Sequence, residues 1–176
     1  PGTGKSYMLD AARESWEDNG YIVRGTALSG IAAHGLKESS GINSMTLQST
    51  LFALEEGYLK LDNKDILVVD EAGMIDTYQM NKLVSHVKKS GAKIVFVGDP
   101  QQLQPIGPGA PLRAVLEKTG YVEMTQIRRQ EVDWQRESTT LLSKGDITGF
   151  DNYKSNNRFK HLDNSSEALM TIVNDW

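Results

Sequence analysis

The sequence contains no cysteine among its 176 residues, and this absence excludes disulfide bonds, thiolate metal sites and cysteine nucleophiles. It also lacks long apolar runs: the longest have the length of a β-strand, so no membrane-spanning segment is expected. No low-complexity tract and no block of like charges is present, which argues against wholesale disorder. What remains is the composition of an ordinary folded domain.

The charge is mildly acidic, with 19 basic and 23 acidic residues and a formal net charge of −4. This balance argues against a basic arm that coats DNA, but it leaves room for a local groove that follows a phosphate backbone. With 39% hydrophobic residues, the chain is long enough to bury a sizeable core in one domain. No signal peptide leads the chain, so the expected location is cytoplasmic.

Both ends of the sequence suggest a segment of a longer protein. The chain begins at Pro1 rather than at an initiator methionine. A phosphate loop follows the pattern G-x-x-x-x-G-K-S/T, and alignment of Gly4, Lys5 and Ser6 with its end would place the first glycine before the first residue. The apolar strand that should precede such a loop is missing as well. At the other end, residues 167–176 predict a helix that is still running at the last position.

Helical and strand patterns alternate along the chain. The predicted helices are 6–19, 30–37, 46–54, 78–89, 111–118 and 134–143, and the predicted strands are 21–28, 66–69, 94–97 and 121–124. The unbroken apolar runs at 66–69 and 94–97 are typical of strands that are buried on both faces. Residues 146–165 are rich in polar side chains and predict a loop or linker. The alternation predicts an α/β fold with a parallel sheet covered by helices.

The segment Gly2-Thr3-Gly4-Lys5-Ser6 opens the first predicted helix. Backbone N–H groups at such a helix start can hold phosphate oxygens. Lys5 would reach the β- and γ-phosphates of a nucleotide, and the Ser6 hydroxyl would bind Mg²⁺. The alternative is a glycine-rich turn that Ser6 caps.

Asp70 and Glu71 directly follow the buried strand at 66–69. Carboxylates at the carboxyl end of a strand lie where α/β sheets bind ligands. Asp70 suits direct or indirect coordination of Mg²⁺, and Glu71 suits a general base that orients the attacking water. The alternative is an acidic turn, with Asp76 as the cap of the next helix. A phosphate loop together with this acidic pair is a much stronger indication of a nucleotide site than either feature alone.

The second buried strand ends in Gly98-Asp99-Pro100-Gln101-Gln102-Leu103. A polar amide at this place can sense a γ-phosphate and transmit its presence to bound nucleic acid. A proline-induced turn with solvated glutamines is an equally good interpretation of the segment alone.

In this order and spacing, the three segments resemble motifs I, II and III of superfamily 1 DNA helicases of the RecD-like branch. The sequence between them is closer still to the helicase region of TraA-type conjugative relaxases. That family's motif Ia, T-L segment and motif IV are similar to Val23–Ala33, Ser44–Leu47 and Met124–Gln130. The resemblance covers roughly residues 1–145, and the motif set is highly specific.

The resemblance implies a RecA-like P-loop NTPase domain with ATP and Mg²⁺ as cofactors and single-stranded DNA as a partner. It implies a nucleotide site formed by Lys5, Ser6, Asp70, Glu71, Gln102 and Arg129. The planar guanidinium of Arg129 would approach the γ-phosphate. It further implies DNA contacts, mostly to the strand's backbone, from Ser29, Gly30 and Thr46. Gln102 would couple the ATP site to the DNA site.

The departures from the family pattern set the expected domain organisation. The first phosphate-loop glycine and its strand are absent, and nothing matches motifs V and VI, which the family carries on a second RecA-like domain. The relaxase domain is absent too. We therefore expect 1–145 to be a first motor domain, incomplete at its N-terminus. Residues 146–176 would be a polar linker and the start of a helix that leads to the second domain.

This segment is expected to be inactive in isolation, as one part of an ATP-dependent DNA helicase. Two alternatives are open. The chain is a degenerate, non-catalytic remnant or scaffold of such a protein, or it belongs to a non-helicase P-loop ATPase. The sequences Q-Q-L-Q-P and I-R-R-Q weigh against the second alternative.

Overall fold

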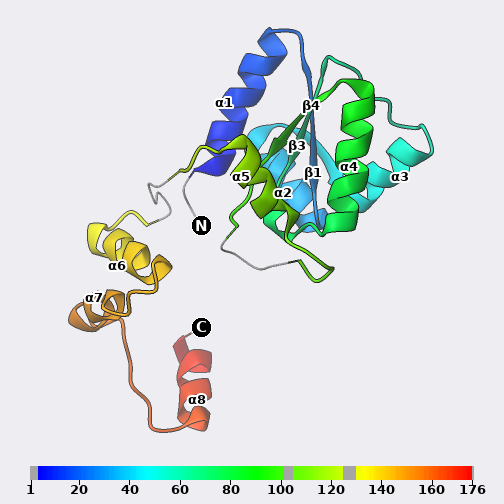
Figure 1. Ribbon diagram of the computed structural model, residues 1–176. Helices are drawn as coiled ribbons and strands as arrows, with labels where there is room; N and C mark the ends of the chain where they lie inside the picture. Colours follow the sequence, from blue (N-terminus) through cyan, green and yellow to red (C-terminus); the bar gives the residue numbers. More distant parts are fainter. Residues whose placement is uncertain (1–3, 101–104, 125–129, 176) are drawn as a thin grey trace. The chain divides into compact units, whose positions relative to one another are not determined.

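The computed structural model describes residues 4–100, 105–124 and 130–175 (Figure 1). Residues Lys5–Met124 form one compact unit, and the described residues that follow belong to a second unit.

A four-stranded parallel sheet forms the centre of the first unit. Its strands are β1 (Ile22–Ala27), β2 (Asn43–Thr46), β3 (Asp65–Val69) and β4 (Lys93–Phe96), in the spatial order β2-β1-β3-β4. Every pair in the sheet is parallel. All five residues of β3 are buried, as its unbroken apolar run predicts. The predicted α/β class with a parallel, helix-covered sheet is confirmed.

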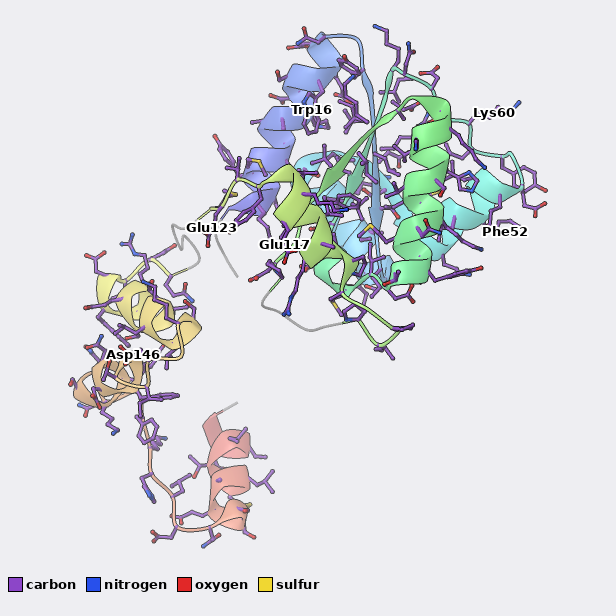
Figure 2. All side chains as sticks on the ribbon, in the orientation of Figure 1. Trp16, Phe52, Lys60, Glu117, Glu123 and Asp146 are labelled. Atoms are coloured by element: carbon purple, nitrogen blue, oxygen red, sulfur yellow. The ribbon has the colours of Figure 1, made fainter. Side chains whose placement is uncertain are left out.

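Helices cover both faces of this sheet (Figure 1). They are α1 (Lys5–Asp18), α2 (Gly30–Ser40), α3 (Leu47–Glu55), α4 (Thr77–Ser90) and α5 (Pro111–Thr119). Alternate residues of β3 enter different hydrophobic clusters: Ile66 and Val68 pack with α1 and α2, whereas Leu67 and Val69 pack with α3, α4 and α5. Trp16, labelled in Figure 2, packs against the first of these clusters.

Three helices of the first unit begin with a polar cap at the carboxyl end of the sheet. Ser29, Thr46 and Asp76 precede α2, α3 and α4, and each side chain accepts a hydrogen bond from the backbone N–H three residues ahead. Such caps satisfy N–H groups that the helix itself leaves free. Thr46 caps the helix that was predicted at 46–54, and Asp76 caps α4, as the alternative interpretation of the acidic turn supposed. Because these helices follow parallel strands, their N-termini lie at one edge of the sheet.

Two strand predictions differ from the structure. Residues 43–46, where no strand was predicted, form the edge strand β2. The strand predicted at Tyr121–Met124 is wrong, because these residues are described without strand pairing. Tyr121 and Val122 are 68% and 96% exposed, so the apolar run does not cover a core. An apolar run becomes a strand only where a sheet edge is available to pair with it.

The second unit contains α6 (Asp133–Ser143), α7 (Gly149–Ser155) and α8 (Ser165–Asp175). Helix α7 lies inside the segment predicted to be a loop. It packs on α6 through the rings of Trp134 and Tyr153, whose centroids are 5.1 Å apart. Gly149 permits this approach, since a Cβ there would lie 2.8 Å from the backbone oxygen of Ser138. The division into a motor domain at 1–145 and a linker beyond it stays a prediction.

No helix in the described parts of the chain has the length and apolar character needed to cross a membrane.

Candidate functional site

The carboxyl edge of the sheet brings the predicted residues of the first unit together. Asp70 directly follows β3, Ser29 lies two residues after the end of β1, and Thr46 ends β2. The registers pair Thr26 with Val69 and Ala27 with Thr46, so the three strands end side by side. This edge is where open α/β sheets bind ligands.

Lys5 and Ser6 form the first turn of α1. The preceding Gly4 has a φ of +85°, a left-handed conformation that glycine adopts without strain. Ser6 is exposed, which suits a hydroxyl that must reach a metal ion and phosphate from solvent. Gly2 and Thr3, the other predicted phosphate-loop residues, lie outside the described residues.

Lys5 approaches Glu71 across the edge of the sheet. The distance from Lys5 Nζ to Glu71 Oε1 is 4.0 Å, and the two side chains are 27% and 36% exposed. A pair at this distance and exposure contributes little to stability. Its significance is chemical, because a candidate phosphate-binding cation and a candidate base lie close enough to contact one small ligand.

The turn that carries Asp70 and Glu71 is tied to both neighbouring strands. The Asp70 N–H donates to the Thr26 carbonyl of β1 at 2.9 Å. The Ala72 N–H donates at 2.9 Å to the carbonyl of Val97, which directly follows β4. Within the turn, the Glu71 N–H donates to Asp70 Oδ1 at 2.9 Å. These bonds hold the acidic turn in one conformation.

Glu71 adopts a left-handed backbone, with φ 52° and ψ 38°. This conformation is uncommon for a residue other than glycine and costs about 1–3 kcal/mol. Such strain persists only where the surroundings enforce it, as the bonds from Asp70 and Ala72 do here. The chain then enters a short 3-10 helix, η1 (Ala72–Met74).

Metal binding at this edge would depend on few protein ligands. The described residues contain no group of three or more His, Asp or Glu side chains arranged to hold a metal ion. Mg²⁺ is commonly held by one or two side-chain oxygens together with nucleotide phosphates and water. Ser6 and Asp70 offer a hydroxyl and a carboxylate of this kind, so the donor set fits Mg²⁺ bound with a nucleotide.

Two glycines that the sequence analysis did not single out bring the segment after Glu71 against the segment after β4. A Cβ on Gly73 would lie 2.8 Å from the Asp99 carbonyl oxygen. A Cβ on Gly98 would lie 3.0 Å from the backbone nitrogens of both Ala72 and Gly73. The two segments therefore touch backbone to backbone. The sequence could have indicated this close contact, because Gly73 closely follows the acidic pair and Gly98 follows a buried strand.

The predicted DNA contacts lie at the starts of α2 and α3. Ser29 and Gly30 are exposed, and Thr46 is half-buried. The Ser29 hydroxyl accepts the Ala32 N–H at 3.1 Å, and the Thr46 hydroxyl accepts the Ser49 N–H at 3.1 Å. The remaining N–H groups of each first turn are suited to bind an anion, which the helix dipole would favour.

Gln102 and Arg129, the remaining predicted nucleotide-site residues, lie outside the described residues. The chain on either side of Gln102 is anchored: Arg113 of α5 donates to the Pro100 carbonyl at 3.2 Å, and the Thr77 N–H donates to the Pro108 carbonyl at 3.2 Å.

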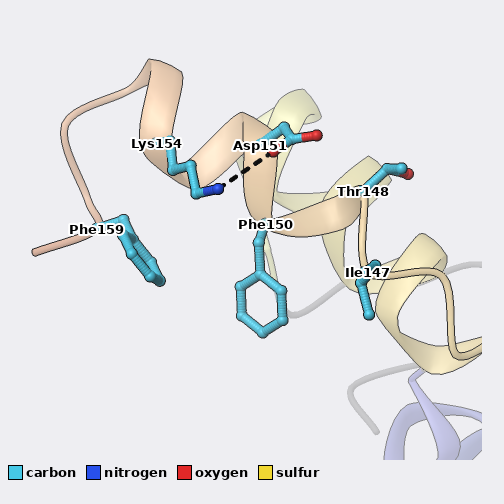
Figure 3. A pocket seen from close by; sticks show the side chains of 6 residues that line it. All are labelled: Ile147, Thr148, Phe150, Asp151, Lys154 and Phe159. Atoms are coloured by element: carbon cyan, nitrogen blue, oxygen red, sulfur yellow. Dashed lines mark ion pairs between the residues drawn. The ribbon is translucent and has the colours of Figure 1, made fainter. Parts of the chain in front are cut away.

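A hollow in the second unit contains none of the predicted site residues (Figure 3). Its lining residues are Ile147, Thr148, Phe150, Asp151, Lys154 and Phe159. Lys154 pairs with Asp151 at 3.6 Å and lies 5.7 Å from the centroid of Phe159. The hollow is therefore an apolar depression whose lysine already pairs with a carboxylate of the same helix.

The AAA domain family matches residues 1–164. The probable conjugal transfer protein TraA of Sinorhizobium fredii (strain NBRC 101917 / NGR234) is 44% identical over 176 residues, which are 99% of this chain and 16% of that protein. Conjugal transfer protein TraA of Agrobacterium fabrum (strain C58 / ATCC 33970) has the same identity and coverage. The ATP-dependent RecD2 DNA helicase of Deinococcus radiodurans is 34% identical over 134 residues, 74% of this chain and 19% of that protein.

These similarities confirm the resemblance that the motifs predicted. The chain spans about one sixth of the length of the TraA relatives, at 16%.

Proposed function

Because this chain belongs to the AAA domain family, we propose that it is part of the motor of an ATP-dependent DNA helicase, which couples ATP hydrolysis to movement along single-stranded DNA in conjugative DNA transfer. The approach of Lys5 to Glu71 at the carboxyl edge of the sheet carries this proposal. It unites the phosphate-loop lysine and the acidic turn, which are far apart in the sequence. We place the protein in the cytoplasm.

Each residue of the nucleotide site has a distinct role in this proposal. The phosphates accept hydrogen bonds from the backbone N–H groups of Gly2, Thr3 and Gly4, and Lys5 neutralises the β- and γ-phosphates. Ser6 and Asp70 hold Mg²⁺, which supplies charge neutralisation when bound. Glu71 orients the attacking water and accepts its proton. Gln102 and Arg129 contact the γ-phosphate.

The DNA strand lies across the starts of α2 and α3 in this proposal, where Ser29, Gly30 and Thr46 contact its backbone. The partners are single-stranded DNA and, in the same polypeptide, a second RecA-like domain and a relaxase domain. ATP occupies the cleft between the two motor domains. Closure on ATP and opening after hydrolysis move the strand. The TraA and RecD2 relatives support this reading by their names and their similarity over this chain.

The test is a DNA-stimulated ATPase assay on the full-length protein that carries this chain. Glu71→Gln is nearly isosteric, so Mg-ATP binding should stay within about two-fold while turnover falls by about 10²-fold or more. The matched control is Glu56→Gln, which changes an exposed glutamate at the end of α3 and should leave turnover unchanged. Unchanged turnover in Glu71→Gln, or no ATPase in the wild type, would overturn the proposal.

A further inference from the structure

Two buried hydroxyl groups connect helix α3 to the end of strand β1. Thr26 on β1 and Thr50 on α3 are 0% and 1% exposed, and their hydroxyl oxygens are 3.1 Å apart. Around them the core is aliphatic: Leu47 and Leu51 of α3 and Val69 of β3 belong to one hydrophobic cluster. A buried hydroxyl is costly unless it is hydrogen-bonded, so this polar pair is held by its partners.

The hydrogen bonds of this pair extend in both directions. Thr50 Oγ1 lies 3.0 Å from the carbonyl oxygen of Thr46, the residue that caps α3. A hydroxyl carries one hydrogen, so if Thr50 donates to Thr46, the Thr26 hydroxyl donates to Thr50. The Thr26 carbonyl in turn accepts the N–H of Asp70 at 2.9 Å. A continuous connection therefore runs from Thr46 through Thr50 and Thr26 to Asp70.

We propose that the Thr26–Thr50 hydroxyl pair couples binding of single-stranded DNA at the start of α3 to the acidic turn of the ATP site. This inference rests on the proposed function. A strand that contacts the first turn of α3 at Thr46 displaces that turn by a small distance. The Thr50 bond transmits the displacement to the end of β1, and the Thr26 carbonyl transmits it to the Asp70 amide.

The acidic turn is suited to respond to such a displacement. Glu71, which follows Asp70, holds a left-handed backbone that its neighbours enforce. A shift at the Asp70 amide therefore changes the geometry of the residue that orients water. Thr26 and Thr50 are positioning residues in this scheme, since neither touches nucleotide or DNA. Couplings between sites typically amount to about 1–3 kcal/mol, or about 5- to 150-fold.

The experiment uses Thr50→Val in the full-length protein that carries this chain. Valine keeps the shape of threonine and removes the hydroxyl. We expect basal ATPase and strand affinity within about two-fold of wild type, and stimulation by oligo(dT) reduced about five-fold or more. Thr50→Ser retains the hydroxyl and should restore most of the stimulation. The double variant Thr26→Val/Thr50→Val should lose no more stimulation than Thr50→Val alone, because both changes break one connection.

Thr139→Val is the matched control. Thr139 of α6 donates to the carbonyl of Gln135 four residues earlier, at 2.8 Å, as Thr50 does within α3. It should leave stimulation by oligo(dT) unchanged.

The outcomes separate this inference from the proposed function. A wild type that oligo(dT) does not stimulate overturns both. A stimulated wild type with equal stimulation in Thr50→Val overturns the inference alone. If Thr50→Val lowers the basal and the stimulated ATPase rates by the same factor, the inference is also overturned, because the hydroxyls then contribute only to the stability of the fold. If Thr50→Val fails to fold because the Thr26 hydroxyl has lost its partner, the double variant Thr26→Val/Thr50→Val replaces it, since that variant leaves no unpaired hydroxyl. Its stimulation by oligo(dT) is then compared with that of Thr26→Ser/Thr50→Ser.

Discussion

Gly98→Ala is predicted to damage both the stability of the chain and the function of the acidic turn. The new Cβ would lie 3.0 Å from the backbone nitrogens of Ala72 and Gly73. Carbon and nitrogen need several tenths of an ångström more, and neither nitrogen can move without the rest of the turn. The Ala72 N–H is also bonded to the Val97 carbonyl, so the strain reaches Glu71 through its direct neighbour.

The size of the effect follows from the cost of overpacking. An extra methyl group forced into a packed site costs about 1–3 kcal/mol. For a chain of this size each kcal/mol lowers Tm by about 2–4 °C. A displacement of a catalytic group by about 1 Å costs up to about 10²-fold in rate, so a smaller shift at Glu71 should lower turnover by about 10-fold.

The assay pairs thermal unfolding of this chain with ATP turnover in the full-length protein. The control is Gly35→Ala, because Gly35 lies inside α2 and a Cβ there meets nothing within 4 Å. Alanine is favoured over glycine in a helix by about 0.5–1 kcal/mol, so this variant should be at least as stable as wild type. A Gly98→Ala protein with wild-type Tm and turnover would refute the view that close backbone contact holds the acidic turn.

Two further predictions concern the isolated chain and the second unit. The 176-residue chain alone should hydrolyse ATP at least about 10²-fold more slowly than the full-length protein, because the charges that a second domain would place at the phosphates are missing; a comparable steady-state rate would contradict this. In the second unit, the Thr148 hydroxyl and N–H donate to Asp146 and lower the pKa of its carboxyl group. This depressed pKa stabilises the fold above the unfolded pKa of about 3.9, and the contribution disappears as pH falls through the folded value. Thr148→Val should therefore lower Tm at pH 7, and the difference should shrink as the pH falls below the unfolded pKa of the carboxyl group. A difference in Tm that does not depend on pH would exclude the carboxylate as its source.

The sheet was predictable where one local signal determines structure. The run at β3 has no polar residue between Ile66 and Val69, and it proved to be buried on both faces. Thr46 lies directly before an apolar helical pattern, and it proved to be a cap. Helix α7 was not predictable in this way, because its polar sequence becomes helical against α6 through Tyr153 and Gly149. Tertiary packing outweighs local propensity in such cases.

The same distinction holds for the candidate site. Lys5 and Glu71 could be named from the sequence, because a glycine-rich helix start and a strand-end carboxylate each have a recognisable pattern. Their 4.0 Å approach required the fold. The hydroxyl pair of Thr26 and Thr50 has no local signature at all. Its partners lie on different elements, and only the packing of α3 on β1 brings them together.

The acidic turn is the point at which these separate contacts meet. On one side, the Asp70 amide is bound to β1 and, through Thr26, to the start of α3. On the other side, the Ala72 amide is bound to Val97, beside the segment that leads to Gln102. Glu71 lies between the two amides in a backbone conformation that neither a free turn nor its own side chain would favour. Changes on the two sides of the turn should therefore have different effects. Thr50→Val would remove the response to DNA while hydrolysis continues, whereas Gly98→Ala would lower hydrolysis with or without DNA.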